Sequence, residues 1–213
     1  MALSAIREDI EFYITLRHPG GCGSLRRFFS CLSSRGLLVL EVQRLMRHYN
    51  ALRRQIGWTP RTLALKLLLL LGRIMAITLA KSDISETSTL DGGVYLSDHG
   101  YLIVGPRRLG RGSLIHQRVT IGAKAGGGPI KPVIGENVWI GPDCIIYGQI
   151  EIGDGATILP GTVLSMNVPA HAVAAGNPAT IIAREFDNAA LRQSLRTDID
   201  RAQFASPCIR SGT

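Results

Sequence analysis

The apolar residues of this chain follow two different periods, and the change between them falls near Ser82. Before Ser82 they recur at helical spacing, whereas after it an aliphatic residue returns every six positions. Neither the helical period of 3.6 residues nor the strand period of 2 produces a six-residue spacing. The pattern therefore predicts a helical region over residues 1–82 and a different architecture from residue 83 onward.

Two helices are predicted in the first half of the helical region. Ser4 is a candidate N-cap for a helix that carries Ile6, Ile10 and Ile14 on one face, and the Pro-Gly-Gly sequence at 19–21 would end it. A second helix presents one apolar stripe made of Leu37, Leu38, Leu45, Met46, Tyr49 and Leu52.

A third helix is predicted to begin at Thr59 and to run to about Ala80, because Thr followed by Pro60 fits an N-cap and the first helical position. It contains a run of five leucines, but Lys66 and Arg73 leave uncharged segments too short to span a bilayer. We therefore expect a buried or interface helix. An interfacial membrane helix is the alternative.

The six-residue repeat occupies the second half of the chain. Its members are Ile84, Leu90, Leu96 and Leu102, then, one residue out of register, Ile103, Leu109, Ile115 and Ile121, and finally Ile134, Ile140, Ile146, Ile152, Ile158 and Leu164. Such a repeat is typical of a parallel β-helix, in which each hexad supplies a short strand and a corner, and three hexads close one coil. The aliphatic residue of each hexad is expected to point inward.

The repeat also divides the chain. We expect a helical N-terminal domain at 1–82, a β-helix domain at 83–184 and a C-terminal tail at 185–213, in which Leu191 and Leu195 could form one short helix. Pro142 and Pro160 are 18 residues apart, one full coil, and should stack on each other.

The positive charge is confined to the helical part. Residues 1–82 hold 13 Lys and Arg against 4 Asp and Glu, a net charge of +9, whereas 83–184 carry −1 and 185–213 carry none. This excess is either a solvated helix face or a surface for an anionic partner such as a membrane. Nucleic acid is not an expected partner, because the basic residues are not interleaved with aromatic ones.

The cysteines and the first residues indicate a cytoplasmic protein. The four cysteines form no C-x-x-C pair and no histidine cluster accompanies them, so neither a metal site nor a disulfide framework is expected. Arg7, Glu8 and Asp9 interrupt the start, which is not typical of a signal peptide. We expect a cytoplasmic location. Attachment to the inner face of the membrane is the alternative.

Short motifs between Asp83 and Arg184 carry a family resemblance. They are Asp83-Ile84, Ser97-Asp98-His99-Gly100, Val119-Thr120-Ile121-Gly122, Gly126-Gly127-Gly128 and Ala175-Gly176-Asn177-Pro178-Ala179. In these residues the chain resembles the hexapeptide-repeat acyltransferases, and within them the serine acetyltransferase branch. The resemblance implies a left-handed parallel β-helix preceded by a helical region. It also implies acetyl-CoA as co-substrate, no metal, and a homotrimer or dimer of trimers with active sites between subunits.

The resemblance places the catalytic histidine at His99. Histidine titrates near neutral pH and can take the proton from an acceptor hydroxyl, so it suits a general base. Asp83 aligns with the aspartate that orients this base, and a carboxylate bonded to one ring nitrogen would fix the tautomer. Asp98 would face the acceptor. His116 and His171 remain as rival bases.

Acetyl-CoA is expected along the side of the β-helix. The cofactor-binding candidates are Gly122, Ala123, Lys124, Gly141, Pro142, Pro160, Gly161 and Arg184. Lys124, Lys131 and Arg184 could meet phosphates of CoA. The two prolines lack the free amides that the family usually has there, which alters the hydrogen bonding to CoA.

Two departures bear on the acceptor. Ile130-Lys131 occupies the place of the Arg-His pair that helps serine acetyltransferases hold the amino acid, which leaves Lys131 as the acceptor-binding candidate. The Gly-Asn-Pro-Ala sequence at 176–179 looks more like that of sugar and polysaccharide O-acetyltransferases. We therefore expect O-acetylation of a sugar or polysaccharide precursor, with serine O-acetyltransferase as the alternative. Another small acceptor and a catalytically idle scaffold also stay open.

Overall fold

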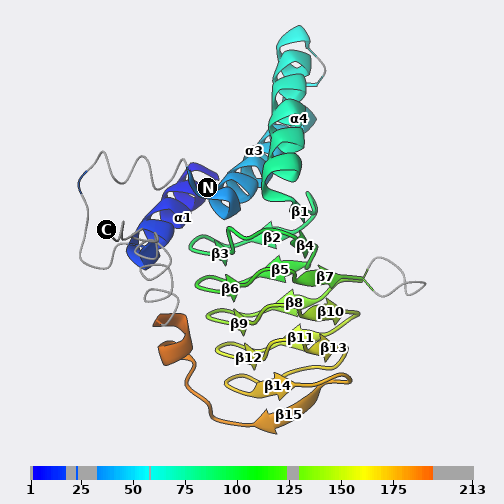
Figure 1. Ribbon diagram of the computed structural model, residues 1–213. Helices are drawn as coiled ribbons and strands as arrows, with labels where there is room; N and C mark the ends of the chain where they lie inside the picture. The colour runs from blue at the N-terminus through cyan, green and yellow to red at the C-terminus, as the bar shows by residue number, and fades with distance from the viewer. Residues whose placement is uncertain (1, 18–22, 24–32, 58, 124–129, 194–213) are drawn as a thin grey trace, which may run out of the picture.

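The computed structural model describes residues 2–17, 23, 33–57, 59–123 and 130–193 (Figure 1). Its described helices are α1 (Ala2–Arg17), α3 (Arg35–Ile56) and α4 (Pro60–Ala80). The predicted start of α4 is confirmed, since the Thr59 hydroxyl accepts a hydrogen bond from the Thr62 amide at 3.2 Å. The predicted cap at Ser4 is wrong, because α1 already begins at Ala2.

The predicted apolar stripe of α3 is only partly buried. Leu37, Met46 and Tyr49 are buried, but Leu45 is 41% exposed. Val39 and Leu40 take part in the core instead, because they lie on the face of α3 that contacts the strands.

Short strands follow the helices, each of two to four residues. They are β1 (Asp83–Ile84), β2 (Thr89–Leu90), β3 (Tyr95–Leu96), β4 (Ile103–Val104), β5 (Arg108–Leu109), β6 (Leu114–Ile115), β7 (Thr120–Gly122), β8 (Val133–Ile134), β9 (Trp139–Ile140), β10 (Ile145–Tyr147), β11 (Glu151–Ile152), β12 (Thr157–Ile158), β13 (Val163–Leu164), β14 (Val173–Ala175) and β15 (Thr180–Ala183).

The strands form three sheets that the chain visits in rotation. One sheet has the order β1-β4-β7-β10-β13, the second β2-β5-β8-β11, and the third β3-β6-β9-β12-β14 with β15 at its end. All pairings are parallel except that of β14 with β15. The chain therefore winds in stacked turns of three strands each, which Figure 1 shows below the helices. The predicted parallel pairing and the helical region before it are confirmed.

The aliphatic members of the repeat fill the inside of these turns. Ile134, Ile140, Ile146, Ile152 and Ile158 are all 0% exposed, as the six-residue spacing predicts. Stacking one such residue on the next in each sheet buries a continuous apolar column. The stacking of Pro142 and Pro160 is also seen, since the amide of Gly161 donates to the Pro142 carbonyl at 2.9 Å.

One register assignment is wrong. Ile103 is 61% exposed, and Val104 occupies the inward position that was expected for it. The corner between β3 and β4 spans residues 97–102, whereas the corresponding corner after β6 spans 116–119. Two additional residues in the first corner move the inward position from 102 to 104, whereas the sequence pattern allowed for one and placed it at 103. This longer corner contains His99.

The helices cover the open edge of the first turn, where β3 and β2 have no neighbouring strand. The Tyr13 hydroxyl donates to the Leu96 carbonyl and accepts from the Leu96 amide, both at 2.8 Å. Asp9 accepts from the amides of Gly93 and Val94, and Arg44 donates to the Leu90 carbonyl at 3.0 Å. These side chains satisfy backbone groups that an exposed strand edge would leave unpaired.

The opposite end of the coil is closed by the backbone itself. β15 turns back and pairs antiparallel with β14, with Ala175 opposite Thr180. Beyond it, the Asn188 side chain donates to the carbonyls of Asn137 and Gly155 at 2.9 and 3.0 Å. Residues 189–193 form a helical turn that includes Leu191, and Leu195 lies outside the described residues.

The prediction that α4 is a buried helix is wrong within the single chain, and its alternative, an interface helix, stays a prediction. α4 projects from the coil beside α3 (Figure 1), and most of its leucines are exposed. Among the described residues, the segment Thr62–Ala80 is long and apolar enough to cross a membrane by length and composition, and only 11% of it is buried. Length and composition do not distinguish a spanning helix from one that lies on a surface.

Candidate active site

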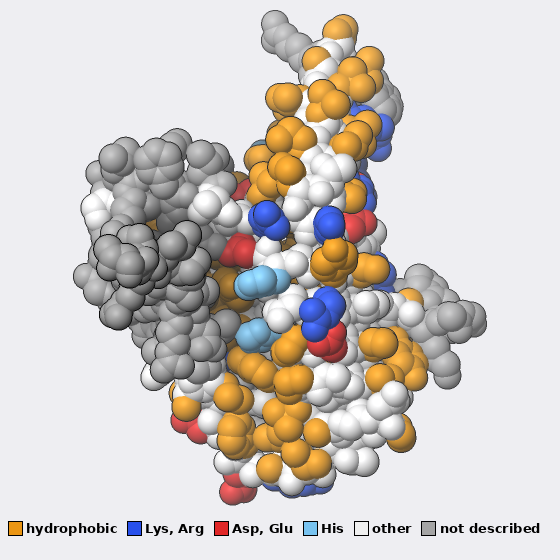
Figure 2. All heavy atoms as spheres, in the orientation of Figure 1, with side chains coloured by type: hydrophobic (Ala, Val, Ile, Leu, Met, Phe, Trp, Pro, Cys, Tyr) orange, Lys and Arg blue, Asp and Glu red, His pale blue; other side chains and the backbone are white. Residues whose placement is uncertain are grey.

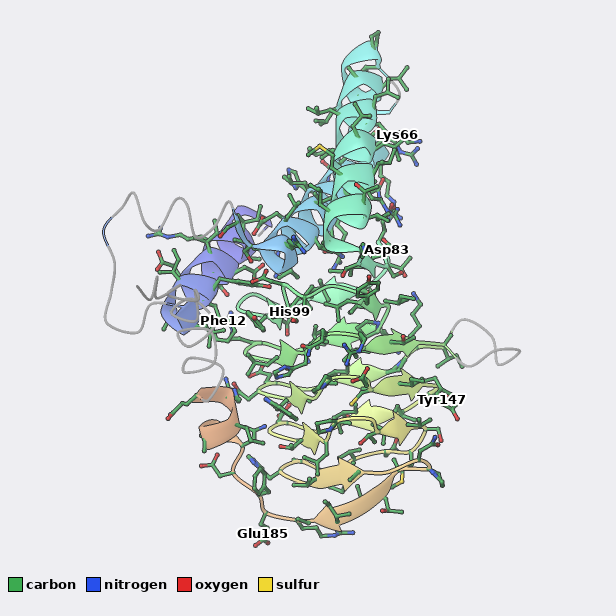
Figure 3. All side chains as sticks on the ribbon, viewed as in Figure 1. Phe12, Lys66, Asp83, His99, Tyr147 and Glu185 are labelled. Atoms are coloured by element: carbon green, nitrogen blue, oxygen red, sulfur yellow. The ribbon has the colours of Figure 1, made fainter. Side chains whose placement is uncertain are left out.

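His99 lies in the long corner after β3, in the turn of the coil nearest the helices (Figure 3). Its side chain is exposed, and its Nδ1 is 3.4 Å from the hydroxyl of Ser97. The corner is tight because the next residue, Gly100, has a φ of 76° and has no room for a Cβ beside the Ala80 carbonyl oxygen. The end of α4 and the corner thus fix the backbone at His99.

The Ser97 hydroxyl lies within hydrogen-bond distance of both His99 and Gln117. It is 4% exposed, and its hydroxyl donates to Oε1 of Gln117 in the next turn at 3.4 Å. The backbone amide of His99 in turn donates to Ser97 Oγ at 3.3 Å. Ser97 therefore connects the candidate base to the turn below it.

Asp83 does not hydrogen-bond to His99 in the part of the chain that the structure describes. Its two carboxylate oxygens instead accept from Nη2 of Arg73 on α4, at 3.1 and 3.2 Å, and Arg73 also pairs with Glu86. The expected orientation of the base by Asp83 is thus replaced by an ion pair between the coil and α4. Arg73 competes for this carboxylate because α4 ends directly before β1.

Asp98 is held by the start of α3. Its Oδ1 accepts from the Ser34 hydroxyl at 2.8 Å and from the Gly36 amide at 2.9 Å. Free amides at a helix N-terminus and the helix dipole both favour a carboxylate there. The residue expected to face the acceptor is therefore positioned by the helical region.

Lys131 lies over the first turn of the coil. Its Nζ donates to the hydroxyls of Ser85 and Thr87, at 3.0 and 2.8 Å. Both hydroxyl residues also line a surface hollow with Asp83, and the complete lining is Arg73, Asp83, Ser85, Glu86, Thr87, Ile103, Val104 and Gly105. The hollow has both signs of charge through Arg73, Asp83 and Glu86, and Lys131 bonds to two of its lining residues from outside the lining.

The rival histidines have different surroundings. The ring of His116 packs against Trp139, with centroids 4.8 Å apart, one turn below Ser97. His171 lies in the far turns with a φ of 54° and covers Gly155, which has no room for a Cβ beside the His171 ring.

The cofactor candidates are spread along the coil. Gly122 ends β7, and Ala123 follows it and is exposed, whereas Lys124 lies outside the described residues. Gly141 with Pro142 and Pro160 with Gly161 form stacked corners, in which Gly141 has no room for a Cβ beside Pro160. Arg184 is exposed directly after β15, at the end of the coil opposite His99.

Two pKa shifts limit the chemistry nearby. Burial raises the pKa of the Cys144 thiol to about 11, so Cys144 stays protonated and is a poor nucleophile. The hydrogen bond from the Arg118 guanidinium lowers the pKa of the exposed Asp143 carboxyl from its ordinary value. Arg118 lies in the turn after that of His99, and its backbone amide donates to the Gly100 carbonyl at 3.3 Å. Asp143 is thus committed as an ion-pair partner.

Sequence reasoning missed the residues that hold the candidates in place. Ser97 belongs to the motif around His99 but received no role, and Arg73 was considered only as a break in an apolar run. Ser34 and Gly36 carried no signal at all, because their contact with Asp98 joins residues more than 60 positions apart. Figure 2 shows histidine side chains beside basic and acidic ones on the face below the projecting helices.

Comparisons with known proteins agree with the repeat. Residues 131–165 match the family model described as bacterial transferase hexapeptide (six repeats). The chain is 32% identical over 183 residues to serine acetyltransferase 2 of Arabidopsis thaliana, a match that covers 84% of this chain and 51% of that protein. The chain thus spans about half of that relative's length.

Solved structures agree with the fold. Serine acetyltransferase from Neisseria gonorrhoeae superposes with a TM-score of 0.69 at 25% identity, covering 87% of this chain and 68% of that one. Serine acetyltransferase from Brucella abortus, solved in complex with coenzyme A, gives a TM-score of 0.67 at 25% identity, covering 85% and 68%. The similarity extends over both the helices and the coil.

Proposed function

Because the chain belongs to the hexapeptide-repeat transferases, in their serine acetyltransferase-like branch, we propose that it is an acetyl-CoA-dependent O-acetyltransferase. The observation that carries the proposal is the similarity to a serine acetyltransferase over 84% of this chain, helices included. The relative solved with coenzyme A supports acetyl-CoA as the donor. No metal is part of the proposal.

His99 acts as the general base. With the Ser97 hydroxyl proton directed to Gln117, Ser97 Oγ can accept a hydrogen bond from Nδ1–H of His99. This arrangement leaves Nε2 unprotonated and able to take the proton of the acceptor hydroxyl. The hydroxyl oxygen then forms a bond to the acetyl carbonyl carbon, the thioester bond breaks, and the CoA sulfur leaves and takes up the proton.

We propose serine, or a similar small amino acid, as the acceptor. The Arabidopsis relative and both solved structures described above are named serine acetyltransferases, which favours the sequence-based alternative over the sugar or polysaccharide acceptor that we expected first. The hollow at Asp83 supports this choice, because Asp83 and Glu86 line it and can meet an ammonium group. Lys131, which bonds to the lining hydroxyls of Ser85 and Thr87, can meet a carboxylate. Lys131 would thus replace the missing Arg-His pair.

Asp98 completes the acceptor site and the other candidates hold the cofactor. Asp98 is fixed by Ser34 and Gly36, so it would face the acceptor from a set position beside His99. Gly122, Ala123 and the stacked corners at 141–142 and 160–161 offer close approach to an extended CoA arm. Lys124 and Arg184 are the proposed phosphate contacts.

The assembly is part of the proposal. We expect a left-handed coil that assembles as a trimer or a dimer of trimers, with each site completed by a neighbouring subunit, since His99 is exposed in the single chain. The domain limits at 82 and 184 and a cytoplasmic location belong to the same proposal. So does contact of the basic N-terminal helices with a membrane.

A thiol-release assay tests the function. The purified chain is incubated with acetyl-CoA and, in separate reactions, with L-serine, with other amino acids and with nucleotide sugars. We expect kcat/KM for serine to exceed that for any saccharide by at least tenfold. A preference for a saccharide would restore the first expectation, and no thiol release with any acceptor would contradict the enzyme assignment.

A further inference from the structure

The α4 helix exposes an unusual amount of apolar surface. Among its described residues, ten large apolar side chains are between 39% and 65% exposed. They are Leu63, Leu65, Leu67, Leu68, Leu70, Leu71, Ile74, Met75, Ile77 and Leu79. Contiguous apolar patches of more than a few hundred Å² are rare on soluble monomers and mark interaction sites.

These side chains surround more than half of the helix. At about 100° per residue, the exposed positions run without a gap from Ile77 through Leu67 to Leu68 and Leu65. The remaining side contains Ala76, which is buried, and the charged residues Lys66 and Arg73, while the third charged residue of α4, Arg61, lies in its first turn. The charges that seemed to interrupt the apolar run therefore do not enter the exposed face.

The exposed face contains almost no polar group that needs water. Thr78 is its one described polar side chain, and its hydroxyl donates to the Ile74 carbonyl at 2.9 Å within the helix. Figure 2 shows the projecting helix mostly as hydrophobic side chains on the face turned to the viewer. Entry of this face into an apolar phase would leave none of its described polar side chains unpaired.

We propose that α4 docks in the plane of an anionic lipid bilayer surface, with its exposed face in the boundary between headgroups and acyl chains. A single partner helix covers a stripe of about 100°, so it would leave much of this face in water, whereas lipid covers all of it. The net charge of +9 in residues 1–82 supplies the attraction to anionic headgroups.

The helix lies on the bilayer and does not span it. α3 packs along α4 and exposes His48, Arg54 and Gln55. A spanning α4 would carry these groups into the hydrocarbon, which is costly for charged side chains. With α4 in the plane, the basic residues of α3 remain at the level of the headgroups.

Vesicle flotation tests the docking. The full chain is mixed with vesicles of phosphatidylcholine alone or with one quarter phosphatidylglycerol, and floated on a density gradient. We expect flotation with the anionic vesicles and a decrease at 0.5 M salt. The Leu68→Gln/Leu71→Gln/Met75→Gln variant should float at least tenfold less.

A matched triple variant at the other end of the molecule is the control. Met166→Gln/Ile182→Gln/Phe186→Gln changes three exposed apolar residues, and it should float like the parent. The proposal is overturned if the parent chain floats with neither vesicle type, or if the α4 variant floats as well as the parent. It is also overturned if the α4 variant loses an oligomeric state in sedimentation equilibrium while no lipid binding is seen, because a second copy of the chain would then cover the face.

Discussion

The two ends of the coil are closed in different ways. At the end near the helices, side chains of α1 and α3 satisfy the open strand edge, with Tyr13, Asp9 and Arg44 bonded to backbone groups of β2, β3 and the corner between them. At the other end, β15 pairs with β14 through the backbone alone. The first solution needs polar side chains and a helix terminus at the edge, and the second needs neither.

This difference coincides with the placement of the candidate chemistry. His99, Asp98 and Asp83 all lie in the first turn, and two of them are bonded to the helical region, Asp98 to Ser34 and Asp83 to Arg73. The far end contains His171 and Arg184 without such connections among the described residues. The candidate site thus lies at the end of the coil where polar side chains of the helices bond to the strand edge.

The strongest test of this difference compares one histidine from each end. His99→Ala should lower turnover by roughly 10²–10⁴-fold, because the base for the acceptor hydroxyl is removed. His171→Ala should retain turnover within about threefold, since its ring covers a glycine far from the first turn. Initial rates of thiol release at saturating acetyl-CoA measure both, and equal losses would place the base elsewhere.

A pair of helix glycines tests the contact between α3 and the edge. A Cβ on Gly36 would overlap the carbonyl oxygen of Leu96, so Gly36→Ala should lower the free energy of unfolding by about 3 kcal/mol. It should also raise the KM for the acceptor, because Asp98 loses its position. Gly72→Ala, whose Cβ would meet only Val42 at 3.9 Å, should stabilise the protein by about 0.5–1 kcal/mol. Urea unfolding distinguishes the two signs.

Removal of one hydroxyl tests how the edge is satisfied. Tyr13→Phe should cost about 2 kcal/mol, because the Leu96 amide and carbonyl would both lose their buried partner. Tyr49→Phe is the matched control in α3. The Tyr49 hydroxyl is buried without a hydrogen-bond partner in the described part of the chain, so its removal should be neutral or stabilising. A similar loss in both variants would contradict the role of Tyr13.

The pH dependence of the free energy of unfolding tests the cost of the Glu41 carboxylate on α3, near Asp9 at the first turn of the coil. Burial, and secondarily the charge of Asp9, raises the pKa of Glu41 to about 7 from its ordinary value of 4.5. The folded state therefore holds this proton more tightly, so the contribution is complete below pH 4.5 and is lost as the pH rises through 7. Glu41→Gln should stabilise the protein by about 1–2 kcal/mol at pH 8, allowing for partial exposure, and have little effect at pH 4. Thermal unfolding at the two pH values measures this, with Glu11→Gln on the exposed face of α1 as the control.

Several features were predictable because they depend on local spacing. The period of six requires one inward side chain per strand and corner, and the burial of Ile134 through Ile158 follows from it. Thr59 and Pro60 predicted the start of α4 from the chemistry of a helix N-terminus. The register at Ile103 was not predictable, because a corner of four residues and one of six both satisfy a short stretch of the repeat.

The sequence by itself determined the parallel pairing, the apolar column and the position of the helical region, since each depends on residues close together in the chain. Its resemblance to a family supplied His99 as the candidate base. Only the tertiary structure decided that Asp83 pairs with Arg73, that Asp98 is held by the start of α3, and that the apolar face of α4 stays uncovered. These features depend on which surfaces of the helices meet the first turn. The helices pack against the first turn because their side chains lower the free energy by hydrogen-bonding to the unpaired backbone groups of its strand edge. A local sequence pattern does not indicate which residues make these contacts.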